Sequence, residues 1–506
     1  MNWNILEEYK DYIGMALFAI SVICFLYLFI NPSMDLYIHT DEQFTLAILT
    51  FPFEKGWELI VNDVHPPLYY LILMAFSGLF NILHIPVDLL YLTKLLSLLP
   101  FAILIIVSYT KIRKEFGWLT SGMFLFALSS MATMSIVFVT SRMYSWSILF
   151  LVMAFIQFID VLKDSNRKSW ILLTVFTSLC MYTHYILVFP LVIMYLLYFL
   201  YIEYNDRIDK KTETKKILKS AVASIMLYVP WIFTLMGQLG TVNKTYLHTT
   251  KLSSNSIVNF LTCFVLQDTK QLTDLIFWKF LILILAIILL ILFITEIKRF
   301  KDYEAFSVFS GFNIYVFSIL IASFMVTFIF KDMTVRYFVA IIAVLWLAIA
   351  ILLSKVKNYK LLAIALVLIL ALGVNGIVTN INDINYHNEL GLKEQNVTNS
   401  INNPDSVVIY NSTYVSYHHL LNNTKEYSLK KSGGVSNPNY IYEENLTKII
   451  EDNPGKNVYL ISQTNNITDQ DVQYPDNITA KKLSRQARIW IMQLTQKTSD
   501  DEEMDY

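Results

Sequence analysis

The chain has 506 residues, of which 55% are hydrophobic and 15% aromatic, and its mean hydropathy is +0.50. These values exceed those of soluble globular proteins and are typical of a polytopic membrane protein. The formal net charge is −1, whereas a nucleic-acid-binding protein is expected to be strongly basic. The composition therefore places the chain in a bilayer and excludes nucleic acid as its expected partner.

An α-helix needs roughly 20 apolar residues to cross a bilayer, and about 11 segments of the chain approach that length. The predicted spans are 12–30, 88–109, 118–138, 141–162, 170–186, 188–203, 217–236, 276–297, 306–330, 337–354 and 360–379. We therefore expect an α-helical polytopic membrane protein with about 11 transmembrane helices, and the apolar runs are compatible with about 11 to 13.

Lysine and arginine in the short connecting segments predict the orientation of these spans. The segments after spans two, four, six, eight and ten read KIRKEFG, KDSNRKS, EYNDRIDKKTETKKILK, KRFK and KVKNYK. The alternate segments carry far fewer basic residues, and basic segments usually remain in the cytoplasm. We therefore expect a multi-pass protein of the cell membrane with a cytoplasmic N-terminus and an extracytoplasmic C-terminal part.

One apolar run, Pro67–Leu83, competes with this topology. If it crossed the bilayer, KIRKEFG would lie outside and every later segment would change sides. A version with thirteen spans, which needs one further crossing, is the competing topology. Because the charge bias opposes that arrangement, we interpret the run as a helix lying at, or dipping into, the outer face. Tyr69 and Tyr70 would then be interfacial aromatic residues.

The C-terminal part changes character at about residue 380. Short apolar runs at Val407–Tyr410 and Asn457–Ile461 predict strands, whereas Val415–Leu421 and Tyr442–Asp452 resemble helices. The chain ends in SDDEEMDY, an acidic sequence typical of disordered ends. We therefore predict that residues 380–506 form a small extracytoplasmic α/β domain with an acidic disordered end.

The predicted membrane domain, residues 1–379, includes one long outer loop with a juxtamembrane helix, residues 31–87. The loop carries four ionisable side chains: Asp41, Glu42, Asp63 and His65. His65 precedes Pro66, which restricts its backbone to an extended conformation and so fixes the end of the loop. Ionisable groups near a membrane are costly and usually have a task, so this loop is the first candidate for a functional site.

Further polar side chains recur at the predicted outer ends of the spans. They are Lys94, Arg142, Tyr144, His184, Arg336 and Tyr337. A single arginine at such a depth often extends its charge to lipid headgroups, and a single tyrosine often belongs to the aromatic belt. Their convergence from non-adjacent segments at one depth instead favours a shared site.

These residue types suit the transfer of a group from a phosphate. A carboxylate can take the proton of an attacking hydroxyl, and arginine binds a departing phosphate with two parallel hydrogen bonds while keeping its charge. Asp41 and Glu42 are adjacent and cannot both point the same way in a helix or a strand. One of them is therefore the expected base, and the other orients the acceptor or a neighbouring cation.

Several motifs resemble the membrane glycosyltransferases of the GT-C superfamily, in its family 39-like branch of protein O-mannosyltransferases and aminoarabinose transferases. They are TDE, NDVHPPLYY, SRMYS, THY, YVPW (Tyr228–Trp231) and RYF, within about residues 10–380. The resemblance implies inverting transfer of a sugar, such as the hexose mannose, from a polyprenyl- or dolichyl-phosphate donor. The acceptor would be a protein or a glycan at the outer membrane face.

The resemblance also implies roles for individual residues. Asp41 matches the general base of the family, and Glu42 matches the acidic residue beside it. Arg142 and Arg336 match the basic residues that hold the lipid phosphate, whereas Lys94 stands near the start of the second span, where relatives often have arginine. We assign substrate binding to Asp63, His65, Lys94, Arg142, Tyr144, His184, Arg336 and Tyr337.

No histidine or cysteine spacing typical of a metal site is present in the sequence, and that branch of the family need not use a metal. We therefore expect no essential cofactor. A divalent cation held by Asp41, Glu42 and Asp63 is the alternative, because these carboxylates are hard oxygen ligands.

Two other functions compete with a transferase. A transporter or flippase of a lipid-linked glycan would place ionisable groups near the bilayer midplane, often in repeated halves. A non-catalytic, membrane-anchored binding protein would leave the acidic loop and the arginines unexplained. Because the charges gather at one rim and no repeat is evident, the sequence favours the enzyme.

Overall fold

In the computed structural model the chain forms two compact units. The first contains Met1–Pro32 and Asp63–Asn382, and the second contains Ser33–Asn62 and Asp383–Tyr506. The structure describes residues 3–30, 40–206, 208–245, 264–265, 272–299, 301–325, 335–411, 421, 423–429, 441–463, 475, 477–486 and 489–496. The predicted acidic end, residues 499–506, and most of the predicted helix 415–421 lie outside these ranges.

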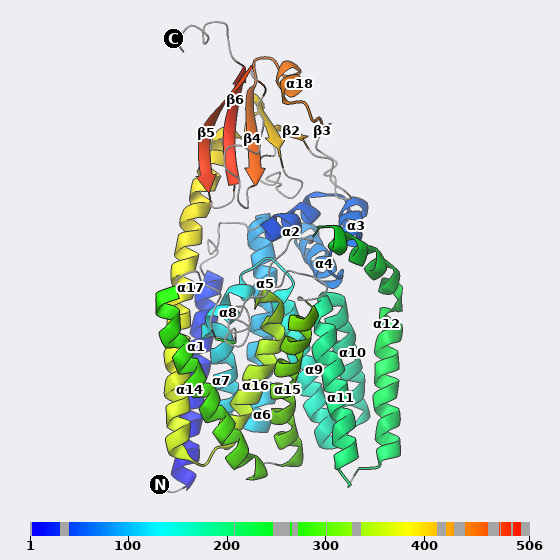
Figure 1. Cartoon of the computed structure of the whole chain (residues 1–506), viewed down its shortest axis with the longest axis vertical. Helices are drawn as coiled ribbons and strands as arrows, with labels where there is room; N and C mark the ends of the chain where they lie inside the picture. The colour runs from blue at the N-terminus through cyan, green and yellow to red at the C-terminus, as the bar shows by residue number, and fades with distance from the viewer. Residues whose placement is uncertain are drawn as a thin grey trace. The chain divides into compact units, whose positions relative to one another are not determined.

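The first unit is a bundle of long helices (Figure 1). Its elements are α1 (Trp3–Ile30), α4 (Leu68–Ile82), α5 (Leu89–Val107), η1 (Ser108–Ile112), α6 (Arg113–Phe116), α7 (Trp118–Ser130), α8 (Ala132–Ser135), η2 (Ile136–Phe138), α9 (Tyr144–Asp164), α10 (Arg167–Thr183), η3 (Tyr185–Leu187), α11 (Val188–Tyr204), α12 (Lys210–Thr245), α14 (Leu272–Glu296), η4 (Ile297–Arg299), α15 (Asp302–Met325), η6 (Val335–Phe338), α16 (Val339–Lys355) and α17 (Tyr359–Ile401), which continues into the second unit.

Within the described residues, nine helices are long and apolar enough to cross a membrane, or ten if a bent pair counts as one span. Over the described residues, each predicted span coincides with one of these helices except 170–186, which forms the shorter α10 of 17 residues. The end of the predicted span 306–330, residues 326–330, lies outside the described ranges. The expected α-helical polytopic fold with a small C-terminal α/β region is therefore confirmed.

The predicted span 118–138 is a broken helix rather than a continuous one. α7 ends at Ser130, Met131 is extended with ψ 133°, and the chain bends by 75° before it continues through α8 and η2. Gly376 of α17 lies against the Ser130 carbonyl, a contact that a Cβ atom would prevent. The break sends the chain into the turn that carries Arg142, just before α9.

α1 packs against α7 with almost no side chain between the two backbones. A Cβ atom on Gly14 would overlap the backbone of Trp118 and Leu119, and one on Gly122 would overlap the carbonyl of Gly14. Small residues permit this close approach of membrane helices, where dispersion contacts rather than the hydrophobic effect hold helices together. The first apolar segment is therefore an integral part of the bundle.

The apolar run predicted to lie at the outer face forms α4, which has 15 residues. At 1.5 Å per residue α4 is about 22 Å long, which is shorter than the roughly 30 Å hydrocarbon core. Its tyrosines are not interfacial, however, because Tyr69 is 1% exposed and Tyr70 is 0% exposed. The expectation of an aromatic belt was wrong here: α4 packs against α5 and α10, and both rings are buried.

Part of the predicted outer loop is helical. In the second unit, α2 (Thr40–Thr50) and α3 (Phe53–Asn62) form a pair of short helices separated by Phe51 and Pro52. α2 begins with two acidic residues in its first turn, where negative charge is stabilised by the helix dipole. Asp41 and Glu42 therefore project from a helix and not from an irregular loop.

The rest of the second unit contains a six-stranded sheet with strand order β3-β2-β1-β4-β6-β5. The elements are β1 (Ser406–Tyr410), β2 (Lys425–Ser428), β3 (Ile441–Tyr442), α18 (Leu446–Glu451), β4 (Asn457–Gln463), β5 (Ile478–Gln486) and β6 (Ile489–Gln496). β1 to β4 pair in parallel, whereas β4–β6 and β6–β5 pair antiparallel. The two predicted strands are present as β1 and β4, and the predicted helix 442–452 is present in shorter form as α18.

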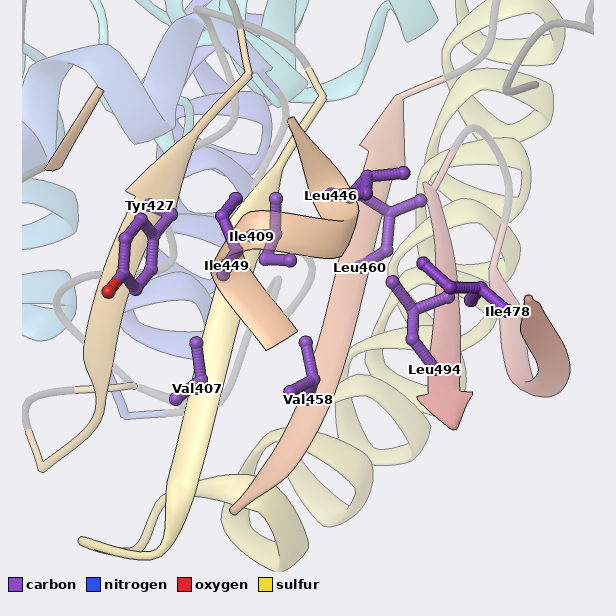
Figure 2. Close-up of a cluster of buried hydrophobic side chains, with 9 residues drawn as sticks. All are labelled: Val407, Ile409, Tyr427, Leu446, Ile449, Val458, Leu460, Ile478 and Leu494. Atoms are coloured by element: carbon purple, nitrogen blue, oxygen red, sulfur yellow. The ribbon is translucent and has the colours of Figure 1, made fainter. Parts of the chain in front are cut away.

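Both faces of the central strands are buried, which explains their uninterrupted apolar runs. One set of alternating side chains packs with α18 (Figure 2): Val407, Ile409, Tyr427, Leu446, Ile449, Val458, Leu460, Ile478 and Leu494. The opposite set packs with the end of α17 at Ile401: Val408, Tyr410, Leu421, Tyr459, Ile461 and Ile491. The sheet is therefore covered on one face by α18 and on the other by the C-terminal end of α17.

Candidate functional site

Most candidate residues of the first unit lie where helices are interrupted. Asp63 and His65 precede α4, Arg142 lies in the turn before α9, His184 joins α10 to η3, and Arg336 lies in η6. At such interruptions side chains are placed by turns and caps rather than by a continuous helix face. Segments far apart in sequence can therefore bring several polar groups to one place.

Four side chains form a hydrogen-bonded group that we call the Asp63–Arg142 cluster: Asp63, His65, Tyr70 and Arg142. The Tyr70 hydroxyl donates to Asp63 Oδ2 at 2.8 Å and accepts from Arg142 Nη1 at 2.9 Å. His65 Nδ1 lies 3.0 Å from the same Asp63 oxygen, and Arg142 Nη2 lies 3.2 Å from His65 Nδ1. Arg142 is 3% exposed, so its charge is held inside the protein.

The protonation of His65 follows from the chemistry of its two neighbours. An ionised carboxylate can only accept a hydrogen bond, and a guanidinium can only donate, so Asp63 and Arg142 compete for Nδ1. The shorter contact assigns the Nδ1 proton to the bond with Asp63. The Nε2 atom, 3.5 Å from Arg142 Nη2, then keeps a lone pair in the neutral ring. Asp63 thus fixes the tautomer and orientation of His65.

The Asp63 carboxylate remains ionised despite its burial. Burial by itself raises the pKa of Asp63, but the charges of His65 and Arg142 and the hydrogen bond from His65 together lower that pKa below its usual value. The lowered pKa means that the folded protein favours the charged form over the neutral form. The charged carboxylate can therefore accept hydrogen bonds from the Tyr70 hydroxyl and from His65 Nδ1–H at neutral pH.

Replacing Asp63 with asparagine should lower the free energy of unfolding at neutral pH by about 1–3 kcal/mol, because buried donors lose a charged acceptor. The lowered pKa makes this stabilisation fully present above the unfolded-state pKa, near 3.9, and lost as pH falls through the folded-state pKa. The difference in melting temperature between wild type and Asp63→Asn should therefore shrink below about pH 4.

Thermal unfolding of the purified protein in detergent, from pH 7 to pH 3, measures this difference. Asp88→Asn is the matched control, because asparagine can keep the N-cap that Asp88 gives to α5 through Leu90 and Tyr91. If the difference in melting temperature between wild type and Asp63→Asn stayed constant from pH 7 to pH 3, the ionised, charge-paired state of Asp63 would be contradicted.

A group of aromatic rings adjoins the Asp63–Arg142 cluster. The His184 ring lies 6.0 Å from the His65 ring, 6.1 Å from the Tyr144 ring and 5.5 Å from the Tyr337 ring, between centroids. The guanidinium carbon of Arg336 lies 5.7 Å from the centre of the Tyr337 ring. These contacts bring candidates from three other segments of the first unit together with His65.

Lys94 lies on α5 and is 7% exposed. Its neighbour Thr93 shares a hydrogen bond of 2.8 Å with Ser141, which precedes Arg142. This bond fixes the α5 segment that carries Lys94 beside the turn that carries Arg142. Lys94 therefore belongs to the same region of the first unit as the Asp63–Arg142 cluster.

Asp41 and Glu42 lie on α2 and so belong to the second unit. Glu42 is fully buried, with 0% exposure, whereas Asp41 is partly exposed. Neighbouring residues of a helix point about 100° apart, which accounts for the difference. Among the described residues, no group of three or more His, Cys, Asp or Glu side chains is arranged to hold a metal ion.

A second string of hydrogen bonds reaches His65 from α12 through residues that are not among the assigned substrate-binding residues. Trp231 Nε1 donates to the Tyr185 hydroxyl at 2.9 Å, the Tyr185 hydroxyl donates to Gln238 Oε1, and Gln238 Nε2 donates to the His65 carbonyl at 3.4 Å. The motifs THY and YVPW contain Tyr185 and Trp231, so they signalled two of these residues. Nothing in the sequence singled out Gln238.

Similarity to known proteins is found at the level of structure and not of sequence. No protein-family model and no curated protein sequence matches the chain. The crystal structure of ArnT from Cupriavidus metallidurans bound to undecaprenyl phosphate matches with a TM-score of 0.60 and 12% sequence identity, over 95% of this chain and 97% of that one. The apo structure of the same protein matches with a TM-score of 0.59 and 11% identity over the same shares.

This chain has the GT-C fold. The match extends over nearly the full length of both chains, so it includes the helical bundle and the C-terminal α/β region. The apolar helices and the GT-C fold together make this a multi-pass membrane protein. The sequence resemblance to the GT-C superfamily is supported at the level of fold, by structures that share few identical residues with the chain.

Proposed function

We propose that this protein is an inverting glycosyltransferase that moves a sugar from a polyprenyl-phosphate donor to an acceptor at the outer membrane face. The observation that carries the proposal is the buried Asp63–Arg142 cluster on a GT-C fold. A buried guanidinium that a tyrosine hydroxyl and an imidazole hold in place suits the binding of a phosphate anion. The ArnT structure with a TM-score of 0.60 is bound to undecaprenyl phosphate, which agrees with a donor of this class.

In the proposed reaction the acceptor hydroxyl attacks the anomeric carbon from the face opposite the phosphate. The bond from that carbon to the phosphate oxygen breaks, and the electron pair leaves with the polyprenyl phosphate. Asp41 takes the hydroxyl proton, while Arg142 neutralises the charge that develops on the leaving phosphate, and His65 and Tyr70 hold the guanidinium in place. Because attack and departure take place on opposite faces, the configuration at the anomeric carbon inverts.

The remaining candidates have supporting roles in this proposal. Glu42 orients the acceptor or a nearby cation, and Asp63 and Tyr70 hold His65 and Arg142 in place. The donor is further contacted by Lys94, Tyr144, His184, Arg336 and Tyr337. The proposed sugar is a hexose such as mannose, the acceptor is a protein or a glycan, and the proposed orientation has the N-terminus in the cytoplasm and the C-terminal unit outside.

The test is transfer by the purified protein in liposomes that contain polyprenyl-phosphate hexoses labelled in the sugar. We expect release of polyprenyl phosphate together with label on an added peptide or glycan acceptor, and no release with Asp41→Asn. A flippase would move the labelled lipid between leaflets without cleaving the sugar–phosphate bond, and a binding protein would retain it unchanged. Either result would contradict the proposed transferase.

A further inference from the structure

His184 is a buried histidine whose two ring nitrogens have different surroundings. It is 6% exposed and lies at the junction of α10 and η3. Its Nδ1 accepts a hydrogen bond of 3.3 Å from the Ile186 backbone N–H and so caps η3. Its Nε2 is buried and has no hydrogen-bond partner among the residues that the structure describes.

The cap determines what the ring can do. A backbone N–H can only donate, so Nδ1 must carry its lone pair, and the ring proton must be on Nε2. In this state His184 cannot accept a proton at Nε2 and is unsuited to act as a general base. It presents a single N–H donor without an acceptor in the described part of the chain, and such a donor is costly inside a protein.

The surroundings of His184 define the acceptor that would satisfy it. Its ring contacts the His65 ring, which Arg142 and Asp63 hold, and also contacts the Tyr337 ring, beside which Arg336 lies. Two guanidinium groups are thus connected to His184 through single side chains. An anionic oxygen would meet the Nε2–H donor and would also be attracted by these positive charges.

Resting on the proposed function, we propose that His184 Nε2–H donates a hydrogen bond to a phosphate oxygen of the polyprenyl-phosphate carrier. His184 then holds the phosphate before and after the sugar leaves, because the phosphate oxygens are present in both donor and product. It acts as a neutral donor, so it recognises the phosphate without adding a further charge to a site that already contains two arginines.

Two substitutions separate this role from the structural one. Asparagine can place its side-chain oxygen near the former Nδ1 position and keep the η3 cap, but it has no donor at the Nε2 position. Glutamine can extend its amide to the former Nε2 position and donate there, but it loses the close cap. If His184 only caps η3, His184→Asn should be well tolerated and His184→Gln should not. If His184 donates a hydrogen bond to the phosphate, His184→Gln should bind undecaprenyl phosphate more tightly than His184→Asn.

The measurement is the equilibrium binding of undecaprenyl phosphate to the detergent-purified full chain, with melting temperature recorded for each variant. We expect His184→Asn to bind about tenfold more weakly with little change in melting temperature, and His184→Gln to keep more of the affinity at a lower melting temperature. His84→Asn is the matched control, because His84 is exposed and its left-handed backbone (φ 52°) suits asparagine.

Three outcomes would overturn the assignment. Binding by His184→Asn within about twofold of wild type would show that the phosphate does not need this donor. Equal loss in both variants would show that an amide at the Nε2 position does not restore binding. If His184→Asn weakened the binding of sugar-bearing donors but not of undecaprenyl phosphate, His184 would contact the sugar and not the phosphate. Failure of the wild-type protein to bind undecaprenyl phosphate would instead count against the proposed function itself.

Discussion

Replacing Arg142 with alanine should lower kcat/KM for sugar transfer about 10³-fold, with a marked rise in the donor concentration needed for half-maximal rate. Arg142 is almost fully buried and is hydrogen-bonded to Tyr70, and it contacts the His65 ring. A buried positive charge is worth more to a leaving phosphate than an exposed one, because little water screens it. Its loss also removes one of the charges that keep Asp63 ionised.

Three further variants show which property of Arg142 matters. Arg142→Lys keeps the charge but has a single nitrogen, so it cannot reproduce the bonds that Nη1 and Nη2 make to Tyr70 and His65, and most of the loss should remain. Tyr70→Phe removes the bridge between Arg142 and Asp63 while both charges stay, and it should cost less. Arg336→Ala should also cost less, because Arg336 is exposed. An unchanged donor dependence in Arg142→Ala would remove Arg142 from phosphate binding.

The sequence predicted most of the membrane helices because their apolar runs are long and bounded by charged segments. It did not predict the break at Met131, since the apolar segments before and after it are continuous enough to form one span and no proline or glycine marks the break. The bend depends on packing against α17 at Gly376, a contact between segments more than two hundred residues apart. Such a contact leaves no periodic signal in either segment.

The helices α2 and α3 were missed for a different reason. The two acidic residues Asp41 and Glu42 are a typical first-turn signal, but the same pair also fits a functional site, so by itself it does not identify a helix. Similarly, α17 continues to Ile401 through a polar sequence rich in asparagine, which has low helix propensity. The end of α17 packs on the sheet through Val397 and Ile401, so tertiary contacts outweigh the local preference.

The candidate site was predicted as a set of residue types and not as an arrangement. His65 and Arg142 were both singled out, but their contact joins positions 77 residues apart. Tyr70 was expected at the membrane interface, because the sequence alone cannot distinguish an aromatic belt from a buried hydroxyl with a charged partner. Polar side chains at helix ends were informative as a group, whereas the individual hydrogen bonds required the fold.

Replacing Asp41 with asparagine should lower kcat by about 10² to 10⁴-fold while the affinity for the donor stays close to that of wild type. The amide has nearly the shape of the carboxylate but cannot take a proton, so the acceptor hydroxyl would attack without a base. Asp41 is the better candidate of the acidic pair because it is partly exposed on α2, whereas Glu42 is fully buried. A base must come within hydrogen-bond distance of a hydroxyl that arrives from outside.

Glu42→Gln is the matched control for Asp41→Asn, since it makes the same chemical change at the next position of α2. We expect Glu42→Gln to retain clearly more turnover than Asp41→Asn, because a fully buried carboxylate has no access to an incoming acceptor. Turnover of Asp41→Asn close to wild type, combined with an inactive Glu42→Gln, would transfer the role of base to Glu42. Single-turnover rates at saturating donor measure this difference directly, because they separate proton transfer from donor binding and product release.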